Sequence, residues 1–76
     1  MYKVKTYVNN IEVGEYEASM WDTVISYVRG FLRGRYDILE TPPDAIARTL
    51  KGRRVLQVFQ DRDHSGVYVV VMGTGR

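Results

Sequence analysis

The sequence predicts a single α+β domain with the element order ββααββ, in which two helices pack on one face of a four-stranded antiparallel sheet. Two observations lead to this prediction. β-branched and aromatic residues gather in two pairs of short segments, one pair near each end of the chain, and two segments with helical spacing lie between the pairs. The domain spans residues 1–76, and we expect residues 73–76 to form a loose tail.

The first predicted hairpin pairs residues 2–8 with residues 11–16. Asn9 and Asn10 tolerate the positive φ that a two-residue turn requires. With that turn, Val8 faces Ile11, and period-two alternation divides the side chains between a core face and an outer face. The core face comprises Val4, Thr6, Val8, Ile11 and Val13, and the outer face comprises Lys3, Lys5, Tyr7, Glu12 and Tyr16.

The first predicted helix follows Ser19, which forms a capping-box pattern with Asp22. Apolar residues then recur at helical spacing from Met20 to Leu32, on one side of the helix. Gly34 is a natural C-terminal stop.

The second predicted helix has Thr41 as N-cap and Pro42 at its first position, and Gly52 ends it. Three residues are expected to be buried, namely Ile46, Ala47 and Leu50.

Residues 55–60 and 67–72 predict a second hairpin that is apolar on both faces. If Gln60 pairs with Val67, one face carries Leu56, Val58, Val67, Val69 and Val71, and the other carries Val55, Phe59, Tyr68, Val70 and Met72. Two helices on one side of the sheet cover only one of these faces. The other face is then an exposed apolar surface, which is typical of an interface unless residues 33–40 cover it.

We therefore expect a small non-catalytic protein-interaction or regulatory module. Its partner would be another protein, a complex or a second copy of the chain in a homodimer. The profile resembles the accessory regulators carried by phages and mobile elements. The predicted partner-binding residues are Tyr7, Tyr16, Phe59, Tyr68, Val70 and Met72.

The alternative function is nucleic-acid binding, because positive charge is concentrated in the middle of the chain. Residues 26–54 carry seven Lys and Arg against three Asp and Glu, whereas the net charge of the whole chain is only +2. Such cations could converge on one helical surface and contact phosphates. The candidate residues are Arg29, Arg33, Arg48, Lys51, Arg53 and Arg54.

The segment 61–66, DRDHSG, resembles the first half of a calcium-binding EF-hand loop, with Asp61, Asp63 and Ser65 as candidate ligands. The twelfth loop position, which needs a bidentate Glu, is Met72, and strands rather than helices are expected on both sides. A polar hairpin turn explains the same residues. We therefore expect a turn and no metal site.

Other functional classes find little support in the sequence. His64 and Ser65 are adjacent in one loop, whereas the members of a serine triad converge from separate positions. We expect no enzyme activity, no cofactor and no small-molecule substrate. The chain has no cysteine and no apolar run long enough to span a bilayer, so we expect a cytoplasmic protein without a membrane partner.

Overall fold

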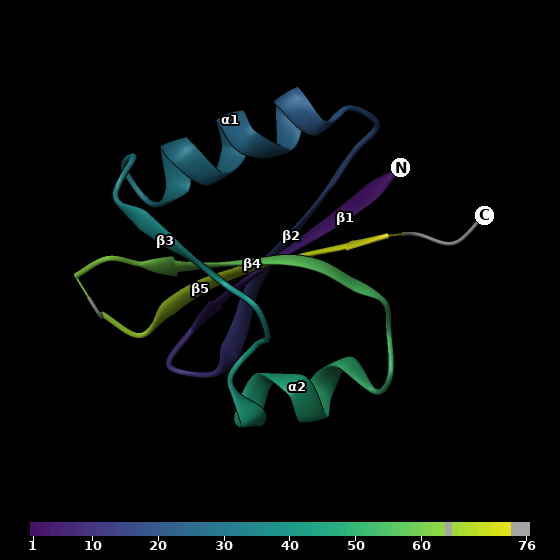
Figure 1. Ribbon diagram of the computed structural model, residues 1–76, viewed down its shortest axis with the longest axis vertical. Coiled ribbons are helices and arrows are strands. Elements are labelled where there is room, and N and C mark those ends of the chain that lie inside the picture. The colour runs from purple at the N-terminus through teal and green to yellow at the C-terminus, as the bar shows by residue number, and fades with distance from the viewer. Residues whose placement is uncertain (64, 74–76) are drawn as a thin grey trace.

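The computed structural model describes residues 1–63 and 65–73. Along these residues, five strands and two helices follow one another in the order ββαβαββ (Figure 1). The elements are β1 (Tyr2–Val8), β2 (Ile11–Ala18), α1 (Trp21–Phe31), β3 (Tyr36–Leu39), α2 (Asp44–Leu50), β4 (Val55–Asp61) and β5 (Val67–Gly73).

The strands form one antiparallel sheet with the order β2-β1-β5-β4-β3. The α+β class and both hairpins are confirmed, but the predicted number of four strands is wrong. The additional strand, β3, lies within the segment that we expected to be a loop, and it pairs with β4 from Tyr36↔Asp61 to Leu39↔Val58. Four residues are too few to show a clear alternation, so no strand is predicted there from the sequence pattern.

The two helices lie on opposite faces of the sheet, as Figure 1 shows, and the prediction of one shared face is wrong. Side chains alternate between the faces along β5. Val69 and Val71 pack in one buried cluster with α1, whereas Val70 and Met72 pack in another with α2. The physical reason is that the second hairpin is apolar on both faces, and each face needs a cover to exclude water.

Helix α2 is anchored to its face of the sheet by Ile46 and Leu50, which are both buried. Ala47, which we also expected to be buried, is exposed. Beside these anchors, the hydroxyl oxygens of Tyr7 and Thr49 lie 3.3 Å apart and form a hydrogen bond between β1 and α2. The short helix is therefore held by apolar burial and by a polar contact.

A β-bulge changes the predicted register of the first hairpin. Asn9 and Asn10 have φ angles of 52° and 69°, and Val8 pairs with Ile11 as expected. The next pairs are Tyr7↔Glu12 and Thr6↔Gly14, so Val13 is the extra residue of the bulge.

The bulge moves Tyr16 to the α1 side of the sheet, where it lies opposite Val4. Ile11 and Val13, both assigned to the core by the uninterrupted pattern, are 67% and 56% exposed. The predicted core face is therefore correct for β1 and wrong for much of β2.

The predicted stop residues Gly34 and Gly52 lie just after the two helices, whereas the predicted N-caps, Ser19 and Thr41, are wrong. Gly34 and Gly52 have left-handed φ angles of 72° and 78°, and so do the residues before them, Arg33 at 56° and Lys51 at 51°, so the left-handed turn that commonly ends a helix begins one residue before each glycine. Neither helix has a side-chain hydrogen bond at its N-cap, so Ser19 and Thr41 do not cap. Pro43 occupies the cap position of α2, and the helix begins two residues later than expected.

Candidate functional site

The apolar face that we expected to be open is closed. Tyr7, Phe59, Val70 and Met72 are each at most 1% exposed. Tyr7, Val70 and Met72 lie beneath α2, and Phe59 lies on the other face in the cluster that contains α1. The prediction that these residues share one exposed surface is wrong, because the two helices divide between the faces.

The other two predicted partner-binding residues lie apart from each other. Tyr68 is half-buried beside the α2 cluster, and its hydroxyl accepts a hydrogen bond of 3.2 Å from Gln60 Nε2. Tyr16 lies on the α1 side and is 38% exposed. Of the six predicted residues, only Tyr16 presents a substantial surface to solvent.

The basic residues of the middle segment do not converge on one surface. Arg29 lies in the last turn of α1 and Arg33 follows that helix, whereas the other four cations belong to α2 and the turn after it. Because α1 and α2 cover opposite faces, the predicted single surface is divided into two groups. The second group comprises Arg48, Lys51, Arg53 and Arg54.

The segment from Asp61 to Gly66 connects β4 and β5 as the predicted hairpin turn. Asp61 accepts hydrogen bonds from the backbone N–H of Asp63 at 3.4 Å and from the Ser65 hydroxyl, and Gly66 has a φ of 82°. The Asp63 carboxylate lies 3.6 Å from Arg35. Within residues 1–63 and 65–73, no group of three or more His, Cys, Asp or Glu is placed to hold a metal ion.

Strand β2 is the longer edge of the sheet and carries an exposed apolar side. Among the described strands, its eight residues pair on one side only, with β1, whereas the opposite edge strand, β3, has four residues. Ile11 and Tyr16 lie on the α1 side of β2, as their partners Val8 and Val4 show. An edge of this kind leaves backbone N–H and C=O groups available to another chain.

An aromatic stack continues this apolar side from β2 onto α1. The rings of Tyr16 and Tyr27 have centroids 4.9 Å apart with an interplanar angle of 3°, and those of Tyr27 and Phe31 are 6.2 Å apart with an angle of 5°. Tyr16 and Phe31 are each 38% exposed. We call these three residues the aromatic flank.

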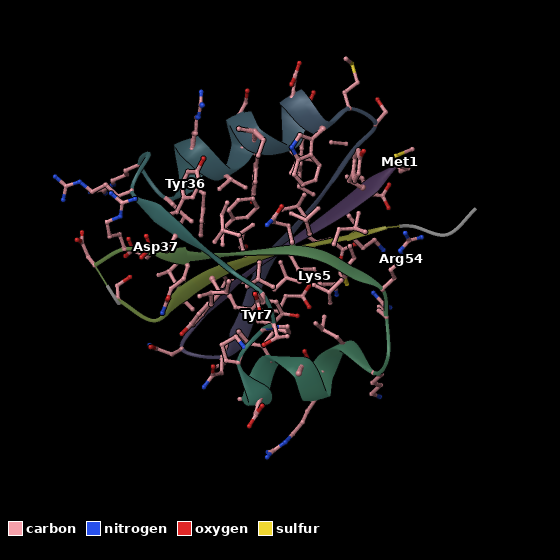
Figure 2. The ribbon with its side chains drawn as sticks, viewed as in Figure 1. Met1, Lys5, Tyr7, Tyr36, Asp37 and Arg54 are labelled. Atoms are coloured by element: carbon pink, nitrogen blue, oxygen red, sulfur yellow. The ribbon has the colours of Figure 1, made fainter. Side chains whose placement is uncertain are left out.

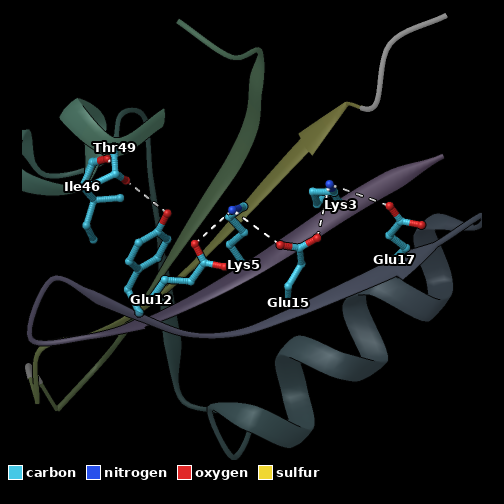
Figure 3. A network of polar contacts seen from close by, with 8 residues as sticks. Lys3, Lys5, Glu12, Glu15, Glu17, Ile46 and Thr49 are labelled. Atoms are coloured by element: carbon cyan, nitrogen blue, oxygen red, sulfur yellow. Dashed lines mark hydrogen bonds and ion pairs between the residues drawn. The ribbon is translucent and has the colours of Figure 1, made fainter. Parts of the chain in front are cut away.

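The opposite side of β2 carries a row of carboxylates, the acidic row, which faces two lysines of β1 (Figure 3). The row comprises Glu12, Glu15 and Glu17. Lys3 lies 3.2 Å from Glu15 and 3.8 Å from Glu17. Lys5 lies 2.9 Å from Glu12 and 3.5 Å from Glu15. These three carboxylates face only two ammonium groups, so the five side chains together carry one excess negative charge.

The same contacts displace two pKa values. The hydrogen bond from Lys5 to Glu12 raises the pKa of the Lys5 ammonium above its usual value, against the opposing effect of burial. The hydrogen bond from Lys3 lowers the pKa of the Glu15 carboxyl, and burial opposes this shift too. Both groups therefore remain charged around neutral pH.

Comparisons with protein-family models, with curated proteins and with solved structures found no match. In the part of the chain that the structure describes, no helix is long and apolar enough to cross a membrane.

Proposed function

We propose that this chain is a non-catalytic protein-binding module that captures an extended segment of a partner along the open edge of β2. The observation that carries this proposal is the two-sided character of that strand. One side presents Ile11 and the aromatic flank, and the other presents the acidic row. A partner strand that adds to this edge would gain main-chain hydrogen bonds, with specificity from alternate side chains.

The two sides define the chemistry of the partner segment. Its apolar side chains would lie on the α1 side, against Tyr16 and Phe31, which are partly exposed aromatic rings of the kind enriched at interfaces. Its alternate residues would be Lys or Arg, since they face Glu15 and Glu17, whose side chains are 42% and 55% exposed. The expected ligand is an extended segment that alternates apolar and basic residues.

A second copy of the chain is a poorer occupant of this edge. Antiparallel pairing of β2 with itself about a two-fold axis would place both acidic rows on the same side of the joined sheet, where like charges repel. The bulge at Val13 also interrupts the regular ladder, so Gly14–Ala18 is the stretch open to regular pairing. Charged side chains and bulges on an edge strand limit edge-to-edge aggregation. Neither feature prevents a partner strand with basic side chains from pairing with β2.

The proposal is tested with a synthetic peptide of the length of β2 that alternates Lys and Val, added to the ¹⁵N-labelled protein. We expect amide chemical-shift changes in Gly14–Ala18 and none in Tyr36–Leu39 of the opposite edge. A peptide that alternates Glu and Val should not bind. A Lys–Val peptide with N-methyl groups on alternate amides keeps the side chains and loses the main-chain donors, and it should also fail to bind.

The matched variants are Tyr16→Glu and Ile38→Glu, which place the same new charge on the two opposite edges. Tyr16→Glu should weaken peptide binding about tenfold, equivalent to about 1.4 kcal/mol, because it removes an aromatic contact. Ile38, 62% exposed on β3, should be neutral. Equal binding of the N-methylated peptide, or an equal effect of the two variants, would refute strand addition at β2.

A further inference from the structure

A separate group of cations has no part in strand addition at β2. Lys3, Lys5, Arg35 and Arg62 each lie within 4.0 Å of a carboxylate. Among the described residues, the six other Lys and Arg side chains form no ion pair, and four of these six lie within seven consecutive positions. We call these four the basic turn, and they are Arg48, Lys51, Arg53 and Arg54, all exposed.

The backbone of the basic turn is fixed at several points. Lys51 and Gly52 both have left-handed φ angles, 51° and 78°, which turn the chain sharply after α2. The Arg53 N–H donates to the Leu50 carbonyl at 3.0 Å, and the Arg54 carbonyl accepts from the Gly73 N–H at 3.2 Å. Figure 2 shows Arg54 at the end of the sheet where β5 ends. The four Cα positions are therefore held by the fold before any ligand binds.

We propose that the basic turn binds the phosphate backbone of nucleic acid. Three of its four cations are arginines, whose planar guanidinium groups match phosphate oxygens in a bidentate geometry. Cations that have no carboxylate partner among residues 1–63 and 65–73 lose no ion pair with those residues when they contact a phosphate. The counterions released from the nucleic acid also favour binding.

The surroundings of the basic turn favour nucleic acid over a lipid surface. A helix that binds at a membrane interface inserts apolar side chains between the lipids. Helix α2 instead buries Ile46 and Leu50 in the sheet. From residue 39 to residue 55 no large apolar side chain is exposed, and the exposed apolar side chain that follows the basic turn is Leu56, at 38%. The basic turn thus combines four exposed cations with one partly covered apolar side chain, which is less apolar surface than a helix needs to insert between lipids.

The test is the salt dependence of binding to a labelled DNA duplex of about 20 base pairs, followed by fluorescence anisotropy. Four phosphate contacts predict a slope of about −3.6 in a plot of log K against log salt, which is about a 150-fold loss of affinity between about 50 and 200 mM salt. Arg53→Gln with Arg54→Gln should halve the slope, so the loss falls to about 12-fold. Lys51→Gln with Arg48→Gln should have the same effect from the other half of the turn.

The matched control is Arg29→Gln with Arg33→Gln, which removes the same charge from the two other cations that form no ion pair in the described residues. We expect this control to keep the slope of the parent protein. An equal reduction by the control would show that net charge alone drives binding. Absence of duplex binding at about 50 mM salt, or binding to anionic phospholipid vesicles in its place, would overturn the proposal.

Discussion

The replacement Ile46→Ala tests whether α2 covers the second face of the sheet. Ile46 is fully buried between α2 and the sheet, and truncation of a buried Ile to Ala costs about 2–5 kcal/mol. A chain of 76 residues is expected to have a free energy of unfolding of about 4–11 kcal/mol. The variant should therefore lose a large share of its stability, and its Tm should fall by at least about 8 °C.

The assay is equilibrium urea denaturation followed by far-UV circular dichroism and by Trp21 fluorescence. Trp21 packs in the α1 cluster, on the face opposite to Ile46. If the two faces unfold together, both signals give the same midpoint, and both midpoints shift equally in the variant. The control is Ala47→Ser, at an exposed position of the same helix, which should cost about 0.5 kcal/mol.

A loss below about 1 kcal/mol for Ile46→Ala would refute the burial argument. It would mean that α2 does not seal this face, and the apolar surface first expected from the sequence would be accessible after all. Light scattering would then distinguish a monomer from a dimer formed through that face.

Three further predictions concern the sheet and the turn after α2. Gly14→Ala should destabilise the protein by about 1–3 kcal/mol, since a Cβ there would meet the Thr6 Oγ1 atom at 2.8 Å. Thermal melts of this variant and of a double variant that also carries Thr6→Ala test the clash. A double variant no more stable than Gly14→Ala would contradict the prediction. The raised pKa of Lys5 means that its ion pair with Glu12 stabilises the fold below the ordinary Lys pKa, and this contribution is lost as pH rises through the pKa of the folded state. The Tm of Lys5→Met should therefore fall less than that of the parent protein between about pH 10 and 12. Parallel plots of Tm against pH for the two proteins would contradict the assignment. Lys51→Gly should raise the Tm, because a residue with a Cβ is destabilised by about 1–2 kcal/mol in the left-handed conformation, and the greater freedom of glycine in the unfolded chain offsets only part of this. An unchanged or lower Tm would contradict this prediction.

The sequence predicted local structure well because the relevant signals lie within a few residues. Two asparagines with positive φ formed the first turn, and Gly52 follows Lys51, the left-handed C-cap residue of α2. The apolar character of both faces of the second hairpin was also predicted correctly, although Gln60 pairs with Tyr68 instead of Val67. A shift of one residue exchanges the members of the two faces and leaves both apolar.

The candidate site was harder to predict because it depends on which elements share a face. The prediction of Met72 as an interface residue depends on both helices covering one side of the sheet, whereas α2 covers the other side and makes Met72 part of the core. The bulge at Val13 cannot be read from alternation, yet it decides that Tyr16 faces α1. Glu15 and Glu17 are visible as acidic residues in the sequence, but their place on an edge strand follows from the sheet order, in which β2 has no second neighbour among the described strands.

The sheet order also has a consequence for the way the chain folds during synthesis. Strand β5 lies between β1 and β4, so Val4 pairs with Val71, a residue from the opposite end of the described chain. Until β5 has left the ribosome, no strand lies between β1 and β4, and the apolar side chains of these two strands lack the contacts that β5 provides. Contacts between distant residues slow folding. Strand β5 is therefore the element that joins the two halves of the sheet, and these halves can pair with it only after it has been synthesised.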